Sequence, residues 1–516
     1  MTIHLSIVVF LPLAAGVLGL LLPRPFARWA ALAGALAVLA VAVGMIADFS
    51  PGAQGLRYRT DIEWIPALGI HYSLGIDGLN LFLVALTAAL WAPATLAAAF
   101  REWERPRQFF FHLMLGETAV LGAFMAQDLA LFVAFFDLML VPFYFLVGAW
   151  GGPNRVAATT KLVIYTLVGS LLMLVGAVAL GVLATPDGGQ ISFALADLRA
   201  RTLPVESQKW IFLVFAAAFL VKAPVFPVHG WLPDAYRATP GPVLALLSGV
   251  LSKVGVYGFL RIVLPVLPDA SVHFQEAMLV LAVVSILYGS VLAFSQDEAR
   301  LVVGYSSIAQ LGFIVLGIFA LDPKGAQGAV MQMVTHGLVA CALFLIIPVL
   351  AARAGGSDSL ARMGGIALRA PVLATMFLIV TFATLAMPGS PNFVGELLIL
   401  FGAFEQKLVY GLVASVGVVL AAVYMIRVFQ QSMHNRVGPA VESREISRPD
   451  LAALAPVVLA IVALGVYPQL ILGRTEPDAT APIQRAAERA GVPGAAAWPG
   501  FATYAPIGGD EGPGSP

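Results

Sequence analysis

Charged residues are scarce in this sequence of 516 residues. Asp, Glu, Lys and Arg make up 11% of the chain, whereas hydrophobic residues make up 60%. Soluble domains contain about 25% charged residues, so this composition excludes an ordinary soluble domain. The 29 basic and 29 acidic residues give a formal net charge of zero, and nucleic acid is therefore not an expected partner.

Cysteine is almost absent as well. Cys341 is the single cysteine, and it lies inside an apolar run. One cysteine cannot form a disulfide, an iron–sulfur cluster or a thiolate zinc site within the chain. The sequence also lacks a phosphate-binding loop, a dinucleotide fingerprint and an HExxH motif. We therefore expect this chain to hold no metal or cofactor, and its chemistry to depend on ionisable side chains.

Long apolar runs fill most of the sequence. Many exceed the roughly 20 residues that a helix needs to cross a bilayer, and a helix satisfies its own backbone hydrogen bonds in lipid. We predict an all-α, polytopic membrane protein with about fourteen transmembrane helices. The predicted spans are 3–22, 28–47, 76–100, 109–126, 128–150, 160–184, 209–228, 241–264, 275–294, 301–321, 326–350, 370–400, 408–430 and 451–472.

Some segments lie outside these runs. The connections 48–75 and 185–208 are long, and Gly188–Gly189 predicts a turn in the second. The tail from Arg474 onward is rich in Pro, Gly and Ala, which predicts loose order. The first run follows no basic residue and is too long for a signal-peptide core, so we interpret it as a span.

The basic residues predict an orientation. An even number of spans places both termini on one side of the membrane. With the termini outside, the cytoplasmic loops hold about 16 Lys and Arg residues against about 11 outside. Arg101, Arg353 and Arg444 are among the cytoplasmic ones. The positive-inside rule thus favours periplasmic termini in an inner (plasma) membrane.

Two predicted spans are interrupted by helix-breaking residues. The seventh contains Pro224 and Pro227, and the twelfth contains Pro388, Gly389 and Pro391. Paired interruptions in two halves of a chain are a sign of an inverted-repeat transporter. The alternative is that prolines are simply common in membrane helices. Because each break has an ionisable neighbour, we predict that both breaks are functional.

Six ionisable residues lie inside apolar runs. A charge at the bilayer centre costs about 2.5–3.5 kcal/mol on insertion scales, so such a residue is a functional hypothesis by default. The alternative is a set of structural ion pairs. Their spread over both halves instead fits a proton relay. The six are Glu117, Asp137, Lys222, Lys253, His336 and Glu396, in spans 4, 5, 7, 8, 11 and 12.

Asp137 and Lys222 form a predicted switch. Burial disfavours a charged ammonium group, and a nearby carboxylate restores it. Movement of the carboxylate would therefore load or release a proton on the lysine. His336 exchanges protons near neutral pH, although a histidine packed in a core is the alternative.

Other polar and aromatic residues have structural interpretations. Asp77 and Asp128 precede predicted spans, where an acid stabilises a helix N-terminus. Trp231 lies near a span end, which is typical of the aromatic belt at a membrane surface.

Several stretches carry a family resemblance. They are FFDLMLVPFYFLVGAWGG, FLVKAPVFPVHGWLPDAYRATPGPVLALLSGVLSKVGVYGFLR, GYSSIAQLGFIVLGI, THGLVACALFLI and MPGSPNFVGELLILFGAF. Over roughly residues 70–435 the chain resembles the antiporter-like subunits of proton-pumping NADH–quinone oxidoreductase (complex I), most of all their M, or chain 4, type. The resemblance implies two inverted five-helix repeats. The implied divisions are 1–100, 101–265 (helices 4–8), 266–435 (helices 9–13), 436–473 and 474–516.

The resemblance also implies roles for the six ionisable positions. Asp137 matches the span-5 acid that pairs with the span-7 lysine, here Lys222. Lys253 matches the span-8 connecting residue, and His336 matches the span-11 histidine. Glu396 matches the span-12 group linked to the outside. Glu117, in span 4, matches a position that is frequently acidic.

Two positions depart from the family pattern. Asp137 stands where the family usually has glutamate, so direct pairing with Lys222 would need water or a helix shift. Gln310 stands where many relatives have histidine, and a glutamine cannot titrate.

The resemblance implies a proton-translocating membrane subunit without its own redox centre. NADH, FMN, iron–sulfur clusters and quinone are then expected in partner subunits, and neighbouring antiporter-like subunits and the bilayer are expected contacts. The alternatives are a subunit of a multisubunit cation/proton antiporter or of a related ion-pumping redox or hydrogenase complex, a stand-alone cation transporter, and a scaffold that has lost pumping.

Overall fold

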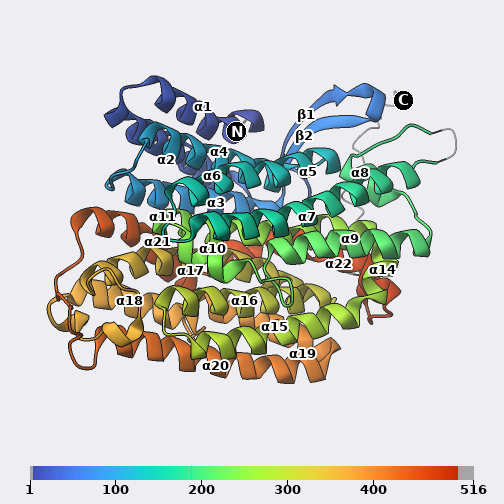
Figure 1. Ribbon diagram of the computed structural model, residues 1–516. Coiled ribbons are helices and arrows are strands. Elements are labelled where there is room, and N and C mark those ends of the chain that lie inside the picture. The colour runs from blue at the N-terminus through green and yellow to red at the C-terminus, as the bar shows by residue number, and fades with distance from the viewer. Residues whose placement is uncertain (1–3, 187–188, 498–516) are drawn as a thin grey trace.

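The computed structural model describes residues 4–186 and 189–497. Most helices run alongside one another, with the N-terminal helices at one edge of the bundle and α18–α20 at the other (Figure 1). The first half comprises α1 (Leu5–Leu21), α2 (Arg24–Asp48), α3 (Gly78–Ala99), α4 (Pro106–Met125), α5 (Leu129–Leu138), α6 (Leu140–Trp150), α7 (Arg155–Leu183), α8 (Leu195–Ala200), α9 (Val205–Lys222), α10 (Leu232–Ala238), α11 (Gly241–Leu246), α12 (Ser252–Gly258) and α13 (Leu264–Val266). The second half comprises α14 (Pro268–His273), α15 (Gln275–Ser295), α16 (Ala299–Phe319), α17 (Pro323–Arg353), α18 (Pro371–Thr384), α19 (Pro391–Gln406), α20 (Leu408–Met433), α21 (Arg448–Val466) and α22 (Gln469–Arg489).

The predicted helical, polytopic class is confirmed. Within the described residues, eleven helical stretches are long and apolar enough to cross a membrane. The predicted number of about fourteen is not reached by this measure. The first helix has 17 residues, and the break in the twelfth span leaves pieces of 14 and 16 residues. The helix before the break in the seventh span has 18 residues, but three of them are charged. The predicted first residue of span 1, Ile3, and Gly188 of the predicted turn lie outside the described residues.

The interior is formed by α17 and by the segment Gly241–Val266, which are almost wholly buried. The segment 241–266 is one continuous helical stretch with two π-helical turns, η2 (Leu247–Leu251) and η3 (Phe259–Val263). α17 packs against α3 and α11 of the first half and against α16 and α19 of the second. The two halves therefore meet along α17.

The connection 48–75 contains a β-hairpin that the sequence reading missed. β1 (Tyr58–Ile65) and β2 (Ile70–Ile76) are antiparallel, with Tyr58 opposite Ile76. Gly69, at φ 60°, lies in the turn, where a left-handed conformation suits glycine. Figure 1 shows the hairpin at one end of the helices, on the side of α8 and α22.

The prediction of loose order after Arg474 is wrong for residues 474–489. These residues belong to α22, which packs against α3, α13, α14 and α17. Asp478 lies on its buried face, and its carboxylate accepts hydrogen bonds from the backbone N–H of Gly78 (2.6 Å) and of Gly55 (3.2 Å). Composition alone hid this amphipathic helix, because its alanines form the packed face.

Candidate functional site

The break in the seventh span is confirmed. α9 ends at Lys222, and a turn segment separates it from α10. The indole of Trp231 donates a hydrogen bond to the carbonyl of Val221 (2.9 Å), and Ser285 of α15 accepts one from the Phe226 N–H (3.0 Å). Trp231 is 3% exposed, so its predicted place at the membrane surface is wrong. It fills the break instead, and protein groups satisfy the freed backbone.

Lys222 lies at the C-terminal end of α9, where the helix dipole favours a cation. Its side chain is buried, and its ammonium lies 4.8 Å from the centre of the Phe136 ring. A ring face attracts a cation at this distance. The position therefore offsets part of the cost of burying the charge.

Asp137 lies in the last turn of α5. Span 5 is one helical stretch, Leu129–Trp150, with a local irregularity at Met139 between α5 and α6 that the sequence reading did not predict. Among the described residues, Asp137 and Lys222 form no ion pair within 4.0 Å, although each lies close enough to act on the other electrostatically. Ser170 of α7 lies beside the Asp137 carboxyl group. The expected indirect pairing of aspartate with lysine agrees with this geometry.

A small cavity of about 20 Å³ lies next to Lys222. This volume holds about one water molecule. Thr166 and Ser252 contribute hydroxyl groups to its lining. The other lining residues are Met139, Leu140, Phe143, Leu162, Trp231, Leu247 and Leu251. The cavity connects the broken seventh helix with the start of α12.

Lys253 is the residue after Ser252 in α12, and Ser252 separates it from the cavity. It is fully buried, and its ammonium donates to the Ser248 carbonyl (2.6 Å) and to the Ser252 hydroxyl (3.3 Å). Both acceptors are neutral. Ser248 lies in the π-helical turn η2, and such turns often occur at functional sites because they disturb the regular backbone pattern. Sequence reading missed Ser248 and Ser252, since serine is common in membrane helices.

His336 lies on the buried helix α17, near Lys253 of α12. The ring is 1% exposed, and neither nitrogen has a hydrogen-bond partner among the described residues. Lys253 and His336 are close enough to interact electrostatically. A packed structural histidine would have its ring nitrogens bonded, so this environment favours the functional interpretation.

Glu396 is held by two amides. Its Oε1 atom accepts from Gln310 Nε2 (2.8 Å) and from Gln332 Nε2 (3.4 Å), and Gln332 Nε2 also donates to Gln310 Oε1 (2.5 Å). Oε2 has no partner among the described residues. Gln332 was missed, although its place four residues before His336 puts both on one face of α17. Gln310 thus contacts Glu396 directly.

The break in the twelfth span is confirmed as well. α18 ends at Thr384 and α19 begins at Pro391. Ala386 (φ 53°) and Gly389 (φ 93°) adopt left-handed conformations between them, and the Ser390 hydroxyl accepts from the Phe393 N–H (3.4 Å). Glu396 lies in the second turn after this break.

Comparisons with known proteins identify the family of this chain. The family model described as NADH:quinone oxidoreductase/Mrp antiporter, TM matches residues 126–421. The chain belongs to this family. It is 36% identical over 483 residues to NADH-quinone oxidoreductase subunit M of Rhodobacter capsulatus, covering 90% of this chain and 94% of the relative.

Solved structures of the family share the fold. A chain of respiratory complex I from Thermus thermophilus superposes with a TM-score of 0.86 at 30% identity, covering 94% of this chain and all of that one. A chain of the Mrp complex from Dietzia has a TM-score of 0.79 at 22% identity, covering 93% and 98%. The second likeness is one of fold alone.

Glu117 stands apart from the other five predicted proton-transfer residues. It is fully buried in α4, and neither carboxyl oxygen has a partner among the described residues. Burial is the influence that acts on the Glu117 carboxyl group, and no cation among the described residues is found to act on it. Its role in proton transfer stays a prediction.

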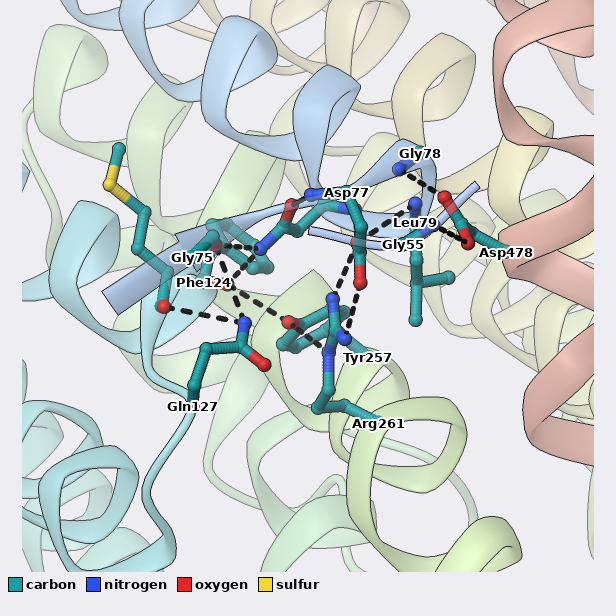
Figure 2. Close-up of polar contacts among 12 residues, drawn as sticks. Gly55, Gly75, Asp77, Gly78, Leu79, Phe124, Gln127, Tyr257, Arg261 and Asp478 are labelled. Atoms are coloured by element: carbon teal, nitrogen blue, oxygen red, sulfur yellow. Dashed lines mark hydrogen bonds and ion pairs between the residues drawn. The ribbon is translucent and has the colours of Figure 1, made fainter. Parts of the chain in front are cut away.

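A cluster of hydrogen bonds with one ion pair joins the start of α3 to the end of segment 241–266 (Figure 2). Asp77 caps α3, as predicted, in a capping box with Asn80. Its two oxygens also accept from the guanidinium of Arg261 at 2.6 and 2.7 Å, and Arg261 Nε donates to the Tyr257 hydroxyl (2.7 Å). Sequence reading missed Arg261 at the end of its apolar run. Its charge is neutralised, which indicates a structural role.

Metal ligation has no candidate in the part of the chain that the structure describes. No group of three or more His, Cys, Asp or Glu side chains there could hold an ion.

Proposed function

We propose that this chain is a proton-translocating membrane-arm subunit of an NADH–quinone oxidoreductase, in which Lys222, Lys253, His336 and Glu396 pass protons. The observation that carries the proposal is the polar route between the two broken helices. It runs from Lys222 through a water-sized cavity to Ser252 and Lys253 and on to His336. Gln332, four residues before His336 on α17, donates to Glu396. Family membership and the name of the Rhodobacter relative support the assignment.

The first step involves Asp137 and Lys222. A carboxylate near the ammonium stabilises its charged form, and withdrawal of the carboxylate removes that stabilisation. The helix is irregular at Met139, two residues after Asp137, and the proposal places the movement of the carboxylate at this point. Withdrawal then releases the Lys222 proton through the cavity towards Ser252 and Lys253.

The later steps carry the proton into the second half. Lys253 receives it, and His336, whose ring nitrogens are unpartnered, can accept and pass it. Gln310 and Gln332 cannot titrate, so their amides hold Glu396 Oε1 while Oε2 takes the proton. Release from Glu396 to the outside completes the transfer.

Redox chemistry belongs to partner subunits in this proposal. NADH, FMN, iron–sulfur clusters and quinone would be held there, and their reaction would drive the movement of Asp137 through neighbouring membrane subunits. The complex would lie in the inner (plasma) membrane, with both termini of this chain on the periplasmic side, as the distribution of basic residues favours.

The test is Lys222→Ala in the assembled complex, reconstituted into proteoliposomes. We expect fewer protons pumped per electron, because the first carrier is lost. Lys209→Ala is the matched control: it lies on the same helix, and its ion pair with Glu206 is on the surface. An unchanged ratio in Lys222→Ala would overturn the proposal.

The antiporter alternative makes a different prediction. An antiporter subunit would exchange sodium or potassium for protons in vesicles without NADH or quinone. Cation-dependent proton movement under those conditions, together with loss of this activity in Lys222→Ala, would favour the alternative.

A further inference from the structure

A second polar cavity lies at the end of the bundle opposite to the β-hairpin. Its volume is about 500 Å³, and it lies where α3 and α17 end and α21 begins. Three arginines line it: Arg101 after α3, Arg353 at the end of α17, and Arg444 before α21. All three lie on the side that the basic residues predict to be cytoplasmic. The proton route does not use this cavity.

Arg353 is fixed in place without a carboxylate. It is 4% exposed, and its guanidinium donates to the carbonyls of Arg444 (2.7 Å), Val349 (2.7 Å) and Glu445 (2.6 Å). Backbone carbonyls orient the guanidinium, and Asp450 and Glu445 act on its charge only from beyond ion-pair distance, while Arg444 adds a second positive charge nearby. A buried charge of this kind calls for a counter-charge.

Two acids, Glu445 and Asp450, also line the cavity, and both accept hydrogen bonds from groups other than the arginines. Glu445 accepts from the backbone N–H groups of Val372, Leu373 and Ile446, at 2.8–3.0 Å. Asp450 accepts from the Ser447 hydroxyl (2.7 Å). Among the described residues, neither acid forms an ion pair within 4.0 Å with an arginine of the cavity. Three arginines against two acids leave a net positive charge.

Apolar surface adjoins the arginines. Phe100, next to Arg101, is 51% exposed and packs edge-to-face against the half-exposed Trp29 of α2. α2 and α21 both pack against α3, and both are among the least buried helices. A ligand that suits this place has an anionic head and long apolar chains.

We propose that this cavity binds the headgroup of an anionic phospholipid, with its phosphodiester between Arg101, Arg353 and Arg444. Basic pockets between membrane helices on the cytoplasmic side commonly bind such headgroups. The acyl chains lie along the exposed apolar faces of α2 and α21. This site goes beyond the proposed function, because it requires no step of proton transfer.

The test uses the assembled complex and photoactivatable phosphatidylglycerol, with phosphatidylcholine carrying the same acyl label as the neutral comparison. After illumination, labelled peptides of this chain are mapped by mass spectrometry. We expect phosphatidylglycerol to label peptides of α2, α3 and α21 in preference to phosphatidylcholine. Equal labelling by the two lipids would overturn the proposal.

The variants locate the site. Each arginine near a membrane surface contributes about 1 kcal/mol to binding anionic lipid, so Arg101→Gln with Arg444→Gln should lower labelling about 25-fold. Arg444→Gln alone should lower it about 5-fold, and this exposed loop residue is safe for folding. Arg362→Gln with Arg436→Gln is the matched control, because it removes two exposed arginines of the same predicted side outside the cavity.

Two further outcomes would also overturn the lipid assignment. If inorganic phosphate abolishes the labelling, the site takes a free anion rather than a lipid headgroup. If the arginine variants release a neighbouring subunit while labelling persists, the cavity binds an acidic protein segment instead.

Discussion

The two broken helices each carry a buried ionisable residue near the break, and the two residues have opposite charges. Lys222 lies at the C-terminal end of the half-helix before its break, and Glu396 lies near the N-terminus of the half-helix after its break. A helix dipole stabilises a cation at its C-terminal end and an anion near its N-terminus. The dipole therefore favours the Lys222 ammonium in the last turn of α9, whereas Glu396 lies beyond the first turn of α19 and depends on the amides of Gln310 and Gln332 instead.

The surroundings of the two groups differ as well. Lys222 faces a ring and a water-sized cavity, so its neighbours can rearrange. Glu396 is held by two amides that also contact each other. In the proposed route, this difference suits release of a proton at the first break and reception of a proton at the second.

The largest effect should come from Glu396→Gln. Glutamine keeps the shape of the side chain but cannot carry a proton, so we expect the number of protons pumped per electron to fall as far as in Lys222→Ala. Proton uptake in proteoliposomes during NADH oxidation measures it. Glu405→Gln, on the same helix but in a surface ion pair with Lys324, should pump normally; a loss there would show that any charge change in α19 is harmful.

Asp137 offers the next largest effect. Asp137→Asn removes the charge that acts on Lys222, so pumping should fall strongly. Asp137→Glu keeps the charge on a longer arm and should pump at least as well as the wild type, because the carboxylate can come closer to Lys222. The same pumping assay distinguishes the two, and equal pumping by both variants would show that the charge at this position is not used.

A smaller effect is expected from Gln332→Leu. It removes one amide of the pair that holds Glu396, and a hydrogen bond to a charged group contributes about 1.5–3 kcal/mol. We expect pumping to slow by about 10-fold or more while the fold is kept. Gln332→Glu would test whether the amide is needed, since an added acid should compete for the proton. Unchanged rates in both variants would remove Gln332 from the site.

The smallest effect should be that of Ser252→Ala. The hydroxyl joins the cavity beside Lys222 to the Lys253 ammonium, and a neutral hydrogen bond contributes about 0.5–1.5 kcal/mol. We expect a decrease in pumping rate of about 2- to 10-fold. Ser271→Ala, whose hydroxyl bonds within its own helix turn, is the control.

The sequence predicted the charged residues of the candidate site but not its neutral polar residues. Lys222, Lys253 and Glu396 were predictable, because a charge in an apolar run is costly and therefore conspicuous. Proline and glycine marked the breaks in spans 7 and 12. Ser252 and Gln332 carried no such signal, since neutral polar residues are ordinary in membrane helices.

Other features depended on tertiary contacts. The β-hairpin was hidden in a long connection. The kink at Met139, in contrast, had a local signal that was overlooked, because Pro142 has no N–H to bond the Leu138 carbonyl. Residues 474–489 were read by composition, whereas burial of Asp478 against the backbone of Gly55 and Gly78 fixes α22. Such contacts between distant segments cannot be read from local patterns.

The central claim is that one route joins the two breaks. The most direct test compares protons pumped per electron in Lys222→Ala, Glu396→Gln and the double variant. Residues that act as one unit are not additive, so we predict that the double variant pumps no less than either single variant. Losses that add up in the double variant would mean two independent routes, and would contradict the account.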